Sequence, residues 1–299
     1  MKHFLSLESL CTSELEALIE HGVELKANRG DLSFRPLMGQ TWAMIFTKSS
    51  TRTRVSFEVG IHELGAHAMF LSGRDLQLGR GEPIKDTARV LGRMVDGAII
   101  RTFDQDDIEG FAAHSNIPTI NALSDAEHPC QVVADLQTMR ERLPDWRGAR
   151  VCFLGDGACN MAISWLWAAK LLDLELVIGA PEGFHPEPEL IARLDSSKIR
   201  VETDPIKAVE GCDVLYTDVW VSMGKEDESE DRIKILQPYQ VNERLIAAAK
   251  PGVIVMHCLP AYRDKEITED VLEAHADVIF EQAENRLHAQ KAILCRSVA

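Results

Sequence analysis

Short apolar runs alternate with longer segments of helical periodicity along the whole chain. The first half contains four predicted strands, at 42–46, 66–71, 98–101 and 118–123. The second half contains five more, at 151–155, 174–178, 200–203, 214–217 and 253–256. Because strand and helix patterns alternate, we expect an α/β fold of two parallel sheets, each flanked by helices.

Two helices are predicted in more detail from their apolar positions. The helix after the first strand is expected to bury Val55, Val59, Ile61 and Leu64. A later helix repeats apolar side chains at helical spacing, at Ile84, Ala88, Leu91 and Val95. We expect this second helix to end at Asp96-Gly97, where an acidic residue and a glycine follow the last apolar position.

Length and charge narrow the class of protein. The chain has 299 residues, which suits two domains, and residues 143–148 are typical of the boundary between them. A content of 45% hydrophobic and 26% charged residues is that of a soluble globular protein. The formal net charge of −15 argues against general binding of a nucleic-acid backbone. An anion site would therefore have to use a few clustered arginines.

The N-terminus and the cysteines indicate the compartment. Acidic residues appear before any signal-like apolar segment develops, and no apolar run approaches the roughly 18 residues that span a bilayer. Seven cysteines without a CxxC pair argue against a disulfide framework or a structural zinc site. We therefore expect a cytoplasmic protein.

The densest cluster of candidate binding residues follows the first predicted strand. Residues 46–54 place hydroxyl and guanidinium groups at the start of a helix. The exposed N–H groups and positive dipole end of a helix attract phosphate, and Arg52 adds a planar clamp for oxyanions. A charged first turn on a surface helix is the alternative, but this density of donors favours an anion site.

Several polar side chains lie just after predicted strands, namely Arg52, Arg101, His128, Asn160, Asp218 and Cys258. Ligands of parallel sheets bind at the carboxyl ends of the strands, so we expect these residues to form one site. His128 stands at a helix start, which lowers its pKa and makes the neutral imidazole the donor. Taken alone, Arg101 has the simpler interpretation of an exposed charge. Arg286 is expected near the start of a terminal helix, where its simpler interpretation is an ion pair with Glu284.

Two features leave alternatives open. Cys258 could be a metal ligand beside His257, a thiol nucleophile, or a small buried apolar residue. The turn that begins at Gly155 resembles the opening of a nucleotide-binding loop, but the third glycine and the ribose-binding acid are missing. A nicotinamide-dependent dehydrogenase is therefore a weakly supported alternative.

Four motifs, in this order and spacing, resemble those of the aspartate/ornithine carbamoyltransferase family over nearly the whole chain. They are Ser50-Thr51-Arg52-Thr53-Arg54, His128-Pro129-Cys130-Gln131, the D-x-W-x-S-M-G segment from Asp218 to Gly224, and His257-Cys258-Leu259-Pro260. The last two are those of the ornithine branch. Cys159 departs from the pattern, because many relatives carry a second asparagine there beside Asn160.

The resemblance implies domains and site residues. Residues 1–145, completed by a C-terminal helix at 283–299, would bind carbamoyl phosphate, and a Rossmann-like domain at 149–282 would bind ornithine. The carbamoyl-phosphate site would contain Ser50, Thr51, Arg52, Thr53, Gln77, Arg101, His128, Gln131, Cys258, Leu259 and Arg286. The ornithine site would contain Asn160, Asp218, Ser222 and Met223. The catalytic residues would be Arg52, Arg101, His128, Asp218 and Cys258.

The resemblance also implies a reaction and an assembly. The carbamoyl group of carbamoyl phosphate would pass to the δ-amino group of L-ornithine, giving L-citrulline and phosphate, without a cofactor or metal. Putrescine or N-acetylornithine is the alternative acceptor, and arginine biosynthesis is the expected context. A homotrimer is expected, with Gln77 lent to the neighbouring active site and no nucleic-acid or membrane partner. A non-catalytic scaffold subunit is the remaining alternative, which the intact site residues argue against.

Overall fold

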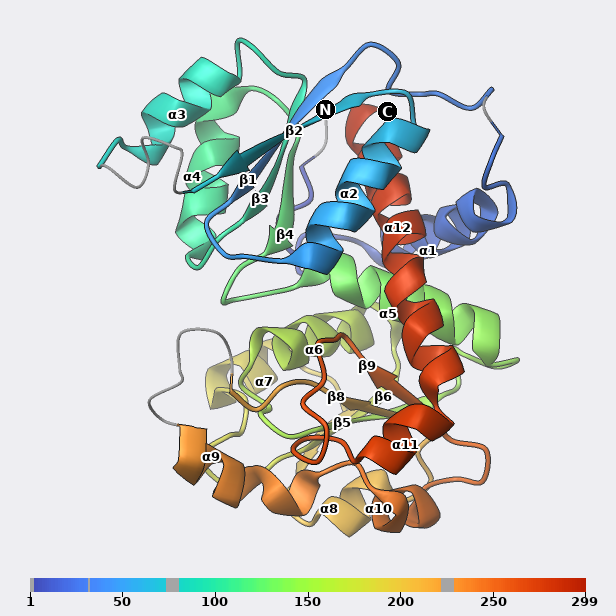
Figure 1. The fold of residues 1–299 in the computed structure, drawn as a ribbon. Coiled ribbons are helices and arrows are strands. Elements are labelled where there is room, and N and C mark those ends of the chain that lie inside the picture. The colour runs from blue at the N-terminus through green and yellow to red at the C-terminus, as the bar shows by residue number, and fades with distance from the viewer. Residues whose placement is uncertain (1–2, 32, 74–80, 222–228) are drawn as a thin grey trace. The chain divides into compact units, whose positions relative to one another are not determined.

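The computed structural model describes residues 3–31, 33–73, 81–221 and 229–299 (Figure 1). The chain divides into two compact units. The first unit comprises Met1–Gln137 and Glu284–Ala299, and the second comprises Thr138–Ala283. Within the described ranges, no helix combines the length and apolar character needed to cross a membrane.

The first unit is built on a parallel sheet with the spatial order β2-β1-β3-β4 and helices on both faces (Figure 1). Its strands are β1 (Thr41–Phe46), β2 (His67–Ser72), β3 (Gly97–Arg101) and β4 (Thr119–Leu123). Its helical segments come from α1 (Thr12–Ala27), α2 (Thr51–Glu63), α3 (Ile84–Leu91), α4 (Gln105–Ser115), α5 (Pro129–Arg142) and α12 (Ala276–Val298). Apolar side chains of β1 and β3, such as Ile45 and Ile100, share one core with Phe111 of α4.

The second unit is built on a five-stranded parallel sheet with the order β7-β6-β5-β8-β9. Its strands are β5 (Arg150–Leu154), β6 (Glu175–Gly179), β7 (Ile199–Glu202), β8 (Val214–Thr217) and β9 (Ile254–His257). Its helices include α6 (Asn160–Leu172), α7 (Pro188–Leu194), α8 (Pro205–Val209), α9 (Ser229–Leu236), α10 (Glu243–Ala248) and α11 (Glu269–Ala274), with a short 3-10 turn at Gln237–Tyr239. This is the Rossmann strand order. The predicted α/β fold of two parallel sheets, the second Rossmann-like, is confirmed.

Each sheet has a switch point that positions candidate site residues. In the first unit the chain leaves β1 toward β2 and returns on the other side of β1 to form β3. In the second unit β5 stands between β6 and β8 in the same way. Loops that leave the carboxyl ends of such neighbouring strands diverge and make room for a ligand.

Two helix predictions are wrong in detail. Val55 is 53% exposed, and the buried face of α2 instead includes the polar residues Thr53 and Ser56. The next helix, α3, ends at Leu91, well before Asp96-Gly97. A Cβ at Gly92 would lie 1.8 Å from the carbonyl oxygen of Ser115, the last residue of α4, so α3 ends where only a glycine fits beside that backbone.

The terminal helix is longer than expected. It begins at Ala276, so Arg286 lies well inside it and not at its start. No glycine or proline occurs between residues 276 and 299 to interrupt the helix. The second half of α12, from Glu284 onward, belongs to the first unit. The residue ranges of the two predicted domains stay predictions.

Candidate active site

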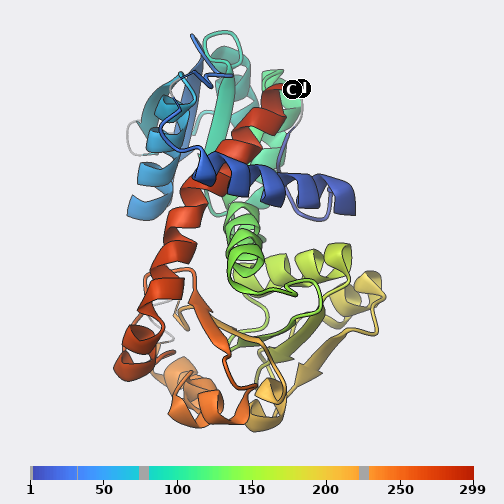
Figure 2. The ribbon, with the colours of Figure 1, turned by 90° about the vertical axis from the view of Figure 1, so that its right-hand side faces the viewer.

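The first group of candidate residues is held at the N-terminus of α2. Ser50 is the N-cap, and its hydroxyl accepts a hydrogen bond from the Thr53 N–H (3.2 Å). Arg286 of α12 donates to Thr53 Oγ1 at 2.5 Å. Figures 1 and 2 both show α2 and α12 side by side. A Cβ at Gly60 would lie 3.2 Å from Lys291 Cγ, so this glycine permits the close approach that brings Arg286 to the helix start.

Arg101 and His128 lie at the carboxyl ends of β3 and β4 in the same sheet. Arg101 is only 8% exposed, so its interpretation as an exposed charge is wrong. Its carbonyl accepts a hydrogen bond from the Thr47 N–H (3.0 Å), which fixes the end of β3 against the segment that leads into α2. His128 is 5% exposed and directly precedes Pro129, the first residue of α5. Arg52 is half-buried in the first turn of α2.

The electrostatic environment keeps His128 neutral. Burial lowers the pKa of this imidazole well below its ordinary value, and the positive charges of Arg286, Arg101 and Lys48 lower it further. The sequence interpretation gave the same direction but assigned it to the helix end. A neutral imidazole surrounded by three cations can donate a hydrogen bond to a ligand oxygen while the cations attract an anion.

Gln131 and Lys48 complete this group. Gln131 is buried in the first turn of α5 and donates from Nε2 to Asp135 Oδ1 at 2.8 Å. Lys48 is buried, with its Nζ 3.0 Å from the exposed Asp125 carboxylate. Lys48 is absent from the predicted site residues, although it stands inside the motif-bearing segment; its position two residues before Ser50 was the available signal.

The second group of candidate residues lies at the carboxyl edge of the second sheet. Asp218 follows β8 and Cys258 follows β9. The Cys258 thiol donates to Asp218 Oδ1 at 2.9 Å, and the Val219 N–H donates to the same oxygen at 2.7 Å. Burial raises the pKa of Asp218, and these two hydrogen bonds oppose that rise. Cys258 therefore has a polar partner and is more than a small apolar residue.

His257 has a structural part in this group. Its Nδ1 accepts a hydrogen bond from the Leu259 N–H (2.9 Å), so the ring proton lies on Nε2, which faces Glu266 Oε1 at 3.1 Å. Donor atoms of Asp218, His257 and Cys258 all lie within 4.8 Å of one another, a spacing that suits a metal ion. Because both His257 nitrogens already have partners, this histidine would have to give up a hydrogen bond to bind one.

The turn after β5 packs against Trp220. Gly155 has a φ of +122°, and a Cβ there would lie 3.0 Å from Nε1 of the buried Trp220. Both the backbone conformation and the close indole therefore favour a glycine at this position. Asn160 begins α6 directly after this turn. The predicted residues Gln77, Ser222 and Met223 lie outside the described residues.

Comparison with known proteins identifies the class. Residues 2–141 match the carbamoyl-phosphate-binding domain of aspartate/ornithine carbamoyltransferases, and residues 147–296 match their Asp/Orn-binding domain. The chain belongs to the aspartate/ornithine carbamoyltransferase family.

Within that family the similar proteins are ornithine carbamoyltransferases. The protein of Akkermansia muciniphila is 57% identical over 98% of this chain and 97% of its own length. The anabolic enzyme of Pseudomonas aeruginosa is 50% identical over 98% of this chain and 96% of its own. The crystal structure of the anabolic enzyme from Campylobacter jejuni has a TM-score of 0.94 at 44% identity, covering 100% of this chain and 99% of that one.

Proposed function

We propose that the chain transfers the carbamoyl group of carbamoyl phosphate to the δ-amino group of L-ornithine, giving L-citrulline and phosphate. The observation that carries the proposal is the first group of residues, in which Arg286 and Ser50 meet at Thr53 beside buried Arg101 and neutral His128. Such a concentration of donors in a chain of net charge −15 suits a small phosphate ester. Two relatives named as anabolic enzymes support the direction of citrulline synthesis.

The two domains would divide the substrates. Residues 1–145 with 283–299 would bind carbamoyl phosphate through Ser50, Thr51, Arg52, Thr53, Gln77, Arg101, His128, Gln131 and Arg286. The Cys258-Leu259 backbone would hold the carbamoyl group from residues 149–282. Asn160, Asp218, Ser222 and Met223 of that second domain would bind ornithine, with the half-buried Asp218 carboxyl facing the α-amino group.

The neutral δ-amine attacks the carbamoyl carbon, and the bond from that carbon to the phosphate oxygen breaks. The electron pair of that bond leaves with phosphate, and the nitrogen loses a proton to the Cys258–Asp218 pair, in which the carboxylate accepts the proton that the thiol gives up. Neutral His128 donates to the carbamoyl oxygen, while Arg52 and Arg101 stabilise charge on that oxygen and on the phosphate. Preorganised donors of this kind contribute about 3–4 kcal/mol each. Cys258, held by Asp218, positions the amine and helps to remove its proton.

The test is a product assay with carbamoyl phosphate and, separately, ornithine, putrescine, N-acetylornithine and aspartate. Citrulline formation from ornithine, with little product from the others, is expected. A preference for another amine would retain the carbamoyl-phosphate half of the proposal and overturn the ornithine half. No product from any amine would overturn both.

The proposal includes a homotrimer. β2 lies at the edge of the first sheet, where its Met69 is 39% exposed, and Val55 of α2 is exposed as well. An edge strand with exposed apolar side chains is a surface that proteins commonly cover. Light scattering should give three times the mass of one chain. Mixed refolding of Gln77→Ala and Cys258→Ser chains, each of reduced activity alone, should raise activity above that of either variant, because some active sites then combine two intact contributions. The cytoplasmic location stays a prediction.

A further inference from the structure

We infer that Glu127 is a positioning residue for His128, an inference that rests on the proposed function. Its side chain ties the N-terminal segment, residues 3–7, to the loop that ends at His128. Glu127 is 5% exposed. Its Oε2 accepts a hydrogen bond from the Leu7 N–H (3.1 Å), and its Oε1 accepts one from the Ser6 hydroxyl.

The loop between β4 and α5 is closed on itself at Glu127. The Ser124 N–H donates to the Glu127 carbonyl (2.9 Å), and the Glu127 N–H donates back to Ser124 Oγ (3.2 Å). Ser124 Oγ also donates to Gln105 Oε1 (2.8 Å) at the start of α4. The loop is therefore a small rigid turn, and His128 is the residue that leaves it.

The N-terminal segment is itself firmly attached. Phe4 is fully buried and forms a parallel bridge with Ile120 of β4, with its N–H donating to the Thr119 carbonyl (2.9 Å). The Asn121 amide donates to the Leu5 carbonyl (2.9 Å). This segment extends the sheet beyond β4, and the Glu127 carboxyl is bound to a fixed support.

A buried carboxyl is costly to the fold, so stability alone is a poor reason for it to be there. Burial raises the pKa of Glu127 to about 7 despite the hydrogen bonds from Ser6 and Leu7 that oppose the rise, and Glu8 raises it further. The side chain is one residue from His128, whose imidazole needs an accurate position. A misplacement of about 1 Å can cost about 100-fold in rate.

The test compares Glu127→Ala, Glu127→Gln and Ser6→Ala. For Glu127→Ala we expect kcat to fall about 10- to 100-fold, with the KM for ornithine changed less than about twofold. Glu127→Gln should recover most of kcat, because the amide can accept from the Leu7 N–H and donate to Ser6 Oγ. Ser6→Ala, which removes one hydrogen bond and keeps the carboxyl, should cause a smaller loss and serves as the test if Glu127→Ala does not fold.

A double-mutant cycle separates positioning from a general structural role. In a His128→Ala background, Glu127→Ala should lower kcat no further, because the residue it positions is gone. An equal loss in both backgrounds would overturn the inference, as would unchanged kcat in Glu127→Ala. Wild-type enzyme in the same assay tests the proposed function separately: an inactive wild type contradicts that function, whereas an active wild type with an equally active Glu127→Ala contradicts only the inference.

Discussion

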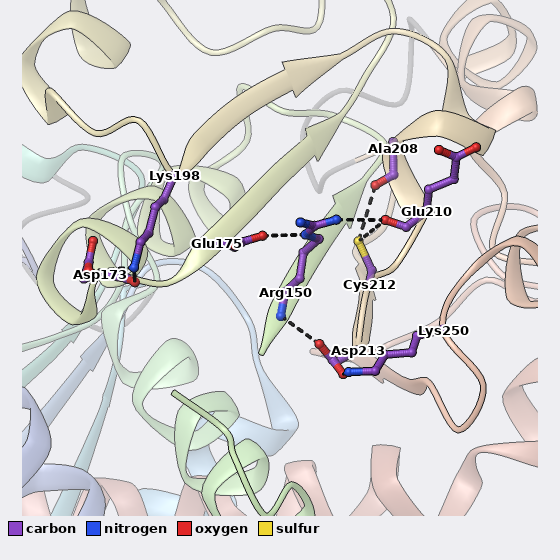
Figure 3. A network of polar contacts seen from close by, with 9 residues as sticks. All are labelled: Arg150, Asp173, Glu175, Lys198, Ala208, Glu210, Cys212, Asp213 and Lys250. Atoms are coloured by element: carbon purple, nitrogen blue, oxygen red, sulfur yellow. Dashed lines mark hydrogen bonds and ion pairs between the residues drawn. The ribbon is translucent and has the colours of Figure 1, made fainter. Parts of the chain in front are cut away.

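Polar side chains are used in opposite ways at the amino ends and at the carboxyl ends of the strands in the second sheet. At the amino ends of the strands, Arg150 begins β5 and Glu175 begins β6. Arg150 Nε lies 2.5 Å from Glu175 Oε2, and the two side chains are 39% and 47% exposed (Figure 3). Asp213 there accepts from the Arg150 N–H (3.0 Å) and pairs with Lys250. At the carboxyl ends of the strands, the buried Cys258 thiol donates to the half-buried Asp218 carboxylate.

The difference shows where the protein accepts the free-energy cost of burying polar groups. Exposed ion pairs keep most of their hydration, so their formation and loss cost little. Buried polar groups lose hydration and are retained where their position matters more than their cost. The first unit repeats the contrast, with Arg54 and Glu58 paired on the surface and Arg101 and His128 buried. Substitutions of buried polar residues should therefore change activity and stability much more than substitutions in exposed ion pairs.

The largest effect is expected for Arg101→Ala. Loss of this buried cation, which in the proposed mechanism stabilises charge on both the phosphate and the carbamoyl oxygen, should lower kcat/KM for carbamoyl phosphate about 10³-fold. Steady-state kinetics at saturating ornithine measure it, with Arg54→Ala as the matched surface control. A loss below tenfold would show that burial at the strand end does not mark function here.

A large effect on stability is expected for Glu127→Gln. The folded-state pKa of about 7 exceeds the ordinary 4.5, so between these values the folded protein holds a proton that the unfolded chain has released. Wild-type stability should therefore fall relative to Glu127→Gln as pH rises from 4.5 to 7, by up to about 3 kcal/mol. Urea unfolding at several pH values measures this; parallel pH profiles for the two proteins would contradict it.

A smaller effect is expected for Cys258→Ser. In the proposed mechanism no covalent intermediate forms, so the thiol would assist the amine and would not be the nucleophile. We expect carbamoyl-phosphate affinity to be kept and kcat to fall about 10- to 100-fold. Calorimetry and turnover measure the two quantities, with Cys11→Ser on the surface as the control. Unchanged turnover would remove Cys258 from the mechanism.

The smallest effect is expected for Arg150→Ala, at the amino ends of the strands in the second sheet. Arg150→Ala removes a network of exposed contacts and should lower the free energy of unfolding by less than about 1 kcal/mol, with kcat unchanged. High salt should weaken even this difference. A marked fall in kcat would contradict the view that only the carboxyl ends of these strands serve function.

The sequence predicts the strands and their site-bearing ends well, because short apolar runs between polar segments have few other interpretations. It misses the orientation of α2, where Val55 faces outward and Thr53 inward. The inward orientation of Thr53 depends on its hydrogen bond with Arg286, which lies 233 residues later in the sequence. It misses Glu127 for the same reason, since Leu7 lies 120 residues earlier. Local pattern carries no information on such pairs.

The return of α12 to the first unit has a consequence for synthesis of the protein. A chain emerging from the ribosome reaches residue 283 with both sheets translated, yet without Arg286 to hold Thr53. Although N-terminal domains commonly fold first during synthesis, this unit is completed only by residues from Glu284 onward. The nascent chain would therefore gain the complete proposed phosphate site only after the whole second unit has been translated.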